Sequence, residues 1–221
     1  MGDTARILLY GLLAVASPTT VLAVFAVLLS RRGRANGTAF AAGFLFGNVA
    51  AFLTAFFIGS TISTRHHGSF RSYAELALGV VLIAVAWRER SPREPTEPGD
   101  SSRMDALFGR LEHVRPAVSF SLGVALGVGT KRLVITAVAA TTVAFAGLSH
   151  VEETGLGVLY VVVGGLAVWL LVAIYLLAGE RADDWIANAK TWLTANTQKV
   201  VYYSSTAFGV AIIGDALVQL L

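Results

Sequence analysis

The sequence predicts an all-α, polytopic membrane protein: six transmembrane helices in two inverted three-helix repeats, with short amphipathic surface helices. Three observations lead to this prediction, namely the composition, six long apolar segments and a weak internal repeat. Of the 221 residues, 55% are hydrophobic and 14% are charged, and the mean hydropathy is +0.68. A soluble domain carries about 25% charged residues, so the deficit indicates a membrane protein.

Six segments are apolar and most are long enough to cross a bilayer, which takes about 20 residues. The third is short, and the fourth is long and interrupted by a Gly-Thr-Lys-Arg sequence. The predicted spans are Ala5–Ser30, Gly37–Ile62, Tyr73–Trp87, Ala117–Ser149, Gly155–Gly179 and Val200–Leu221.

The distribution of Lys and Arg predicts the orientation in the cytoplasmic membrane. Twelve of the 17 fall in the first, third and fifth loops, and three fall at the N-terminus and in the second loop. Because cytoplasmic loops are enriched in Lys and Arg, we expect both termini to lie outside. The same bias accounts for the basic balance of the chain without a nucleic-acid partner. The twelve are Arg31, Arg32, Arg34, Arg88, Arg90, Arg93, Arg103, Arg110, Arg115, Arg181, Lys190 and Lys199.

The long third loop divides the chain into a first repeat over residues 1–88, a linker over 89–116 and a second repeat over 117–221. The linker begins with the Pro-rich, charged sequence SPREPTEPGDSSR, which is typical of a flexible segment. Within it, Met104, Leu107, Phe108 and Leu111 share one face of a short amphipathic helix. A second interfacial helix is predicted near 183–197, with two Trp side chains at headgroup depth.

The two halves resemble each other under an offset of 112 residues. The offset places Gly11 on Gly123, Ser17-Pro18 on Gly129-Thr130, and Gly43 on Gly155. An odd number of spans in each half would insert the second copy upside down, which is an architecture that recurs in transporters.

The same offset aligns two expected helix breaks. Pro18 lies in the first span and removes a backbone donor, while Gly127, Gly129 and Thr130 weaken the equivalent point of the fourth span. Broken helices in lipid require cover by protein or water. We therefore expect Lys131 and Arg132, which follow the second break, to face a polar interior.

Two interpretations of these cations stay open. They are structural, through snorkelling or pairing with an acid, or they bind an anionic substrate headgroup such as a phosphate or sulfate. Asp215 in the last span is the first candidate for a counter-ion or proton carrier, and Glu75 is the second. The predicted substrate-binding and translocation residues are Ser17, Pro18, Thr19, Asn48, Lys131 and Arg132. For Asn48, a hydrogen bond across helices is an equal alternative.

Other patterns suggest less. The adjacent pair His66-His67 lacks companion ligands, so no metal site or cofactor is predicted. The patterns GFLFG (Gly43 to Gly47) and GVALG (Gly123 to Gly127) favour close packing between helices of this chain. Residues His150, Glu152 and Glu153 are expected in a solvated outer loop. No catalytic constellation or nucleotide motif falls in the spans, so the sequence does not indicate an enzyme.

The chain resembles the LysE superfamily of small exporters, and within it the GAP, or (peptido)glycolipid-addressing protein, family. The stretch ASPTTVLAVFAVLLSRRGRANGTAFAAGFLFGN carries most of the likeness, together with TWLTANTQKV before FGVAIIGDALVQL. Relatives often show Asn-Pro-Lys at the second break, where this chain has Gly129-Thr130-Lys131, so Lys131 is retained and Asn and Pro are not. On motif grounds the resemblance carries over Ser17, Pro18 and Lys131.

The resemblance implies a multi-pass inner-membrane protein that moves lipids or small solutes outward. Together with the two cations, it predicts an exporter of an anionic lipid or glycolipid-type amphiphile, with proton coupling left open. One alternative is an exporter of a small amino-acid or ionic solute, and a second is a non-transporting membrane subunit of a lipid export complex. The expected partners are membrane lipids and the amphiphilic substrate, and a homodimer or an export-complex partner is also considered.

Overall fold

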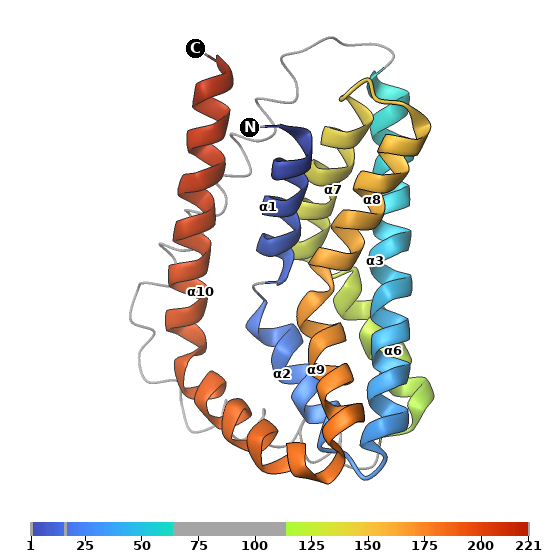
Figure 1. Cartoon of the computed structure of the whole chain (residues 1–221), viewed down its shortest axis with the longest axis vertical. Helices are drawn as coiled ribbons and strands as arrows, with labels where there is room; N and C mark the ends of the chain where they lie inside the picture. The colour runs from blue at the N-terminus through green and yellow to red at the C-terminus, as the bar shows by residue number, and fades with distance from the viewer. Residues whose placement is uncertain (1, 16, 64–113, 221) are drawn as a thin grey trace.

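A computed structural model describes residues 2–15, 17–63 and 114–220 of the chain, and over these ranges every regular element is helical. Figure 1 shows the helices running up and down one elongated bundle, with both termini at the same end. The elements are α1 (Asp3–Val15), α2 (Pro18–Leu28), α3 (Gly33–Ser63), α6 (Pro116–Gly127), α7 (Thr130–Ala144), α8 (His150–Gly164), α9 (Leu166–Ala178), the 3₁₀ turn η1 (Gly179–Ala182) and α10 (Asp183–Leu220).

Most of the apolar length is in broken helices. Across the ranges described, α3 alone passes as a continuous span by length and composition, over Gly33–Ser60. Three helix pairs pass when each pair is taken together: α1 with α2, α6 with α7, and α8 with α9. They bend by 57°, 60° and 58°, respectively, which gives up to four spans by these criteria.

Two of the three breaks are where the sequence predicts them. Pro18 opens α2 because its missing N–H is not needed in the first turn of a helix. The second break falls at Val128-Gly129, and Thr130 begins α7. The third break was not predicted; it falls within the fifth predicted span, Gly155–Gly179. The helix ends at Gly164 and restarts after Gly165, and each glycine in a helix interior costs about 1 kcal/mol relative to alanine.

Two other boundaries differ from the prediction. The interfacial helix near 183–197 does not end before the last span, because no Gly or Pro stands between Asn196 and Val200; α10 is one helix of 38 residues. Figure 1 shows it curving around one end of the bundle before it runs toward the other. Its buried stripe includes Ile186 and Leu193, whereas Trp185 and Trp192 are exposed.

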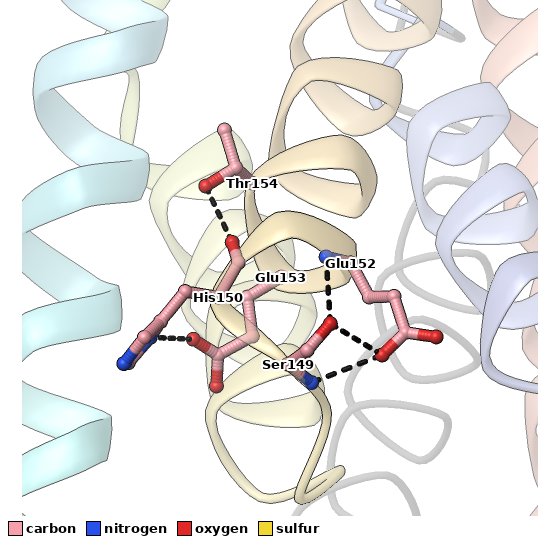
Figure 2. A network of polar contacts seen from close by, with 5 residues as sticks. All are labelled: Ser149, His150, Glu152, Glu153 and Thr154. Carbon is pink, nitrogen blue, oxygen red and sulfur yellow. Dashed lines mark hydrogen bonds and ion pairs between the residues drawn. The ribbon is translucent and has the colours of Figure 1, made fainter.

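The segment around His150 is not a loop but the first turn of α8. Figure 2 shows the reason, a capping box in which the Ser149 Oγ accepts from the Glu152 backbone N–H and the Ser149 N–H donates to Glu152 Oε2 at 3.0 Å. His150 Nδ1 lies 3.2 Å from Glu153 Oε2 on the same turn. Ser-x-x-Glu before an apolar run is the sequence signature of such a start.

The two small-residue patterns pack against each other, as intramolecular contacts. A Cβ added at Gly47 would lie 2.6 Å from the Val124 carbonyl oxygen, and one at Gly127 would lie 2.7 Å from the Phe44 carbonyl oxygen. Gly43 and Gly123 likewise meet the backbone of Phe120 and Phe40. Side chains larger than hydrogen would separate α3 from α6, so the glycines set the closeness of this contact.

The buried apolar residues form two clusters, one on each side of the breaks. The first joins α1, α7 and α8 around Tyr10, Val143 and Tyr160. The second joins α2, the start of α3, α9 and α10 around Phe25, Phe40 and Ile186. The breaks therefore create a layer between two apolar cores.

Several predictions fall outside the ranges that the structure describes. These are the third span Tyr73–Trp87, the amphipathic linker helix at Met104–Leu111, the pair His66-His67, and Glu75.

Candidate functional site: a buried arginine between three helix breaks

Arg132 lies in the first turn of α7, just after the second break. Its side chain is buried, with 6% of its surface exposed. The guanidinium Nη1 donates to the Ala14 carbonyl oxygen at 3.0 Å, and Nη2 donates to the Gly164 carbonyl oxygen. Ala14 is near the end of α1 and Gly164 is the last residue of α8, so one side chain joins all three breaks.

Both carbonyls lack their usual helical donor. In an α-helix the Ala14 carbonyl would accept from the N–H of residue 18, but residue 18 is proline and has none. The Gly164 carbonyl would accept from Val168, whose N–H instead donates to Gly165 at 2.9 Å. An unpaired carbonyl in an apolar interior costs several kcal/mol. Arg132 supplies the missing donors.

The surroundings of the guanidinium also neutralise its charge. The last carbonyls of a helix carry a partial charge equivalent to about −0.5, so the ends of α1 and α8 together approach one negative charge. Phe44 adds a ring face 4.5 Å from Arg132 Cζ. Asn48 Oδ1 accepts from Arg132 Nε at 3.5 Å. All four contacts come from neutral groups, an arrangement that neither sequence interpretation of the cation included.

A second polar contact lies one turn further along α7. Thr136 Oγ1 and the Tyr160 hydroxyl are 2.7 Å apart, and both residues are buried. Because α7 and α8 are antiparallel, the pairs Arg132–Gly164 and Thr136–Tyr160 form successive contacts between these helices. Asn48 Nδ2 also donates to the Val161 carbonyl at 3.5 Å, which ties α3 to the same place.

The first break places its predicted site residues beside a cavity. Ser17 is the N-cap residue of α2, in an extended conformation and without a side-chain capping bond; its Oγ accepts from Thr20 Oγ1 at 3.1 Å. Pro18 is buried, whereas Thr19 is exposed. Ser17 and Pro18 line a mostly apolar cavity of about 310 Å³ whose far wall is α10, through side chains that include Trp185 and Trp192.

The structure thus brings together part of the predicted set. Asn48 and Arg132 are in contact, and Ser17 and Pro18 are at the break whose carbonyl Arg132 binds. Lys131 is in the first turn of α7 and Asp215 is in α10, but the structure describes only their backbone; Glu75 is outside the described ranges. The pairing of Lys131 with an acid therefore stays a prediction.

Sequence reasoning missed several members of this layer. Ala14 and Gly164 take part through backbone oxygens, which carry no side-chain signal. Phe44 and the pair Thr136–Tyr160 were also not predicted, because such residues are common in apolar spans. The Gly164-Gly165 pair and a tyrosine in an otherwise aliphatic run were the available signals. Over the ranges described, no group of three or more His, Cys, Asp or Glu side chains could hold a metal ion.

The sequence matches the family model described as "Sap, sulfolipid-1-addressing protein" over residues 7–218, which is nearly the whole chain. No curated protein and no solved structure matches it. This family is the GAP family of the LysE superfamily, consists of transporter-like membrane proteins rather than enzymes, and is implicated in the addressing and export of a glycolipid. The protein is therefore a membrane protein with apolar helical spans that belongs to the sulfolipid-1-addressing protein family.

Proposed function

We propose that the protein exports an anionic lipid or glycolipid-type amphiphile across the cytoplasmic membrane. The observation that carries the proposal is the buried Arg132 where three helix breaks meet, in a family implicated in sulfolipid addressing. Polar and charged groups inside a membrane bundle are costly and usually mark a substrate path. A sulfate or phosphate on the substrate would meet a cation in this layer.

The proposal includes six spans arranged as two inverted three-helix repeats, over residues 1–88 and 117–221, joined by the linker 89–116. The offset of 112 residues supports it, because the offset carries Val15, the last residue of α1, onto Gly127, the last residue of α6, and Pro18 onto Thr130. The bends of 57° and 60° at these two breaks are also alike. In Figure 1, α1–α2 and α6–α7 run in opposite directions along the bundle.

The layer also contains helix N-termini, which would favour an anion beside the carbonyl ends that Arg132 binds. The helices α2 and α7 begin at the breaks, and the N-terminal end of a helix carries a partial positive charge. In transporters, such half-helix ends point at anionic substrate groups. We assign Ser17, Pro18, Thr19 and Asn48 to the path, with Lys131 as the cation that meets the headgroup and Arg132 as the group that holds the breaks together.

Asp215, or else Glu75, would serve as the counter-ion of Lys131 and could carry a proton during transport. With no nucleotide-binding motif in the sequence, proton exchange is the coupling that this proposal favours. An exporter of a small amino-acid or ionic solute is the first alternative, and two neighbouring cations argue against a cationic solute. A non-transporting subunit of an export complex is the second.

The test is transport by the full chain in liposomes, measured as transfer of a fluorescent sulfated glycolipid between leaflets. Lys131→Ala should reduce the transfer rate at least tenfold, because it removes the proposed headgroup cation, and the thermal unfolding temperature should not change. Lys199→Ala, which removes an exposed charge from α10, should leave the rate unchanged. An unchanged rate in Lys131→Ala would refute the site assignment, and the absence of transfer by the wild-type protein would favour the subunit alternative.

A further inference from the structure

A polar cavity, separate from the apolar one beside Pro18, lies at the other end of the bundle from the termini, where α2 turns into α3 and α9 turns into α10 (Figure 1). Its volume is about 640 Å³. The lining includes Arg31, Arg32, Arg34, Tyr175, Gly179 and Asp183. None of these residues belongs to the layer around Arg132.

Hydrogen bonds from Asn36 hold the turn that carries the three arginines. Asn36 is fully buried, and its Nδ2 donates to Ser30 Oγ at 2.8 Å and to the Val114 carbonyl at 3.0 Å. Its backbone N–H donates to the Arg32 carbonyl at 2.8 Å. The backbone under the arginines is therefore organised before any ligand arrives, which lowers the entropy cost of binding.

Two glycines keep the opposite walls of the cavity close. A Cβ at Gly33 would lie 2.6 Å from the Tyr175 hydroxyl oxygen. Gly179 has φ +58°, a left-handed conformation that favours glycine, and a Cβ there would lie 3.0 Å from Arg34 Nη2. The Arg34 guanidinium thus reaches across the cavity to the end of α9.

Among the described side chains that line the cavity, cations outnumber anions. Three guanidinium groups accompany one carboxylate, and in the described part of the chain no ion pair joins Asp183 to Arg31, Arg32 or Arg34. The Asp183 Oδ1 atom is buried and has no hydrogen-bond partner among the described groups. Guanidinium groups bind sulfate and phosphate oxygens through paired N–H donors, whereas a carboxylate accepts from hydroxyl groups.

Apolar surface adjoins this polar cavity. Leu176 and Leu177, near the end of α9, are exposed, and Leu177 retains 89% of its accessible surface. On α10, just after Asp183, Trp185 is exposed, as is typical of a side chain at headgroup depth. A ligand with both a charged headgroup and hydrocarbon chains fits these neighbours better than a free anion does.

We propose that this cavity binds the sulfate or phosphate headgroup of an amphiphile that also bears hydroxyl groups, with its chains along the exposed leucines of α9. The arginines would hold the oxyanion, and Asp183 would accept from a hydroxyl. The identity of the ligand rests on the proposed function, whereas the location of the binding site rests on the residues that line the cavity. The cavity would be a docking site distinct from the Arg132 layer.

The test is calorimetric titration of the full chain, in an uncharged detergent, with a short-chain sulfated glycolipid. Arg31→Gln with Arg34→Gln should weaken binding at least tenfold, and binding of the desulfated parent lipid should not change. The control removes one exposed charge further along α10, Lys199→Gln, and should alter the affinity less than threefold. Equal weakening in the control and in the double arginine variant would mean unspecific attraction to basic residues, and would overturn the proposal.

Two further measurements identify the ligand's chemistry. Inorganic sulfate should compete only at concentrations at least a hundredfold higher than the lipid; competition at equal concentration would show a site for the free anion and overturn the headgroup assignment. Asp183→Asn should weaken the glycolipid severalfold but not decyl sulfate, which has no hydroxyl groups. Equal effects on both would refute the role of Asp183.

The outcome is separable from that of the proposed function. If Arg31→Gln with Arg34→Gln binds the lipid as the wild type does, while Lys131→Ala abolishes transfer, the docking site is wrong and the exporter stands. If binding depends on the arginines while Lys131→Ala transfers lipid normally, the docking site stands and the assignment of the Arg132 layer as the path fails.

Discussion

The guanidinium of Arg132 donates to the carbonyl oxygen of Ala14 at 3.0 Å, across 118 positions of sequence. That carbonyl is the one whose helical donor Pro18 eliminates. A proline in the first span and an arginine in the fourth are therefore two parts of one arrangement. The proline frees an acceptor in an apolar interior, and the arginine occupies it while the helix end offsets the positive charge.

This relationship predicts an energetic coupling between the two residues. Arg132→Met should destabilise the protein, because it leaves the Ala14 and Gly164 carbonyls buried without donors, at about 1–3 kcal/mol for each group. In a Pro18→Ala background the residue-18 N–H can bind Ala14, so the cost of Arg132→Met should fall by about 1 kcal/mol. Thermal unfolding of the four proteins in detergent measures the difference.

The control for this cycle is a proline with no link to Arg132. Pro116 opens α6, and Pro116→Ala should change the cost of Arg132→Met by less than about 0.5 kcal/mol. Additive costs for Pro18→Ala and Arg132→Met would show that Arg132 does not compensate for the missing donor.

The glycine contact between α3 and α6 predicts that Gly→Ala is harmful within this contact and harmless at a glycine outside it. Gly123→Ala should destabilise the protein by about 1–3 kcal/mol, because the methyl group meets the backbone of Phe40. Gly155→Ala is the matched control, since a Cβ there meets nothing within 4 Å and alanine improves helix propensity by about 1 kcal/mol. Thermal unfolding temperatures should move down for Gly123→Ala and stay level or rise for Gly155→Ala. If Gly123→Ala is tolerated as well as Gly155→Ala, the helices do not need this closeness.

Features that depend on interactions between residues close in sequence were predicted correctly, whereas contacts between distant segments were not. The breaks at Pro18 and Gly129 could be predicted because proline and glycine act on their own turn. The all-helical, membrane-spanning character likewise follows from apolar segments that are local in sequence. The patterns GFLFG and GVALG were each predicted to pack against a helix of this chain. That they pack against each other was not predicted.

The neutralisation of Arg132 could not be predicted in the same way. From the sequence, carboxylate side chains were the expected partners of Arg132, because a sequence does not show which backbone oxygens are unpaired. The actual partners are backbone oxygens whose availability depends on breaks elsewhere in the chain. Two other features that were not predicted do have a signal in the sequence. The Ser149–Glu152 capping signal was present, and the Gly164-Gly165 pair differed from the isolated glycines around it.

The buried hydroxyl pair on α7 and α8 predicts a second coupling. Thr136→Val and Tyr160→Phe each remove one oxygen and preserve most of the side-chain shape. Each single change should cost about 1–3 kcal/mol, because it leaves the other hydroxyl buried without its partner at 2.7 Å. The double variant should cost less than the sum of the two by about 1 kcal/mol. If chemical denaturation shows that the losses of unfolding free energy in the two single variants add up in the double variant, the two hydroxyls do not interact.

The arrangement of the ends predicts which residues face the cell exterior. The chain contains no cysteine, so single cysteines can be introduced without a background thiol. Thr4, in the first turn of α1, and Arg31, between α2 and α3, are both exposed. In Figure 1 the start of α1 lies at the end of the bundle that holds both termini, and α2 turns into α3 at the opposite end. Because the Arg31–Arg34 turn is basic, we expect it in the cytoplasm. A membrane-impermeant maleimide should label Thr4→Cys in intact cells and Arg31→Cys only after the membrane is opened.

A permeant maleimide provides the control, since it should label both variants equally in intact cells and so show that each thiol is reactive. The labelling also bears on the docking cavity, because an exporter must collect its substrate from the cytoplasmic side. Labelling of Arg31→Cys from outside would place the arginine cavity on the exit side and reverse the proposed direction of loading. Labelling of both variants from outside would contradict a chain in which α2 and the start of α3 lie at the opposite end of the bundle from the N-terminus.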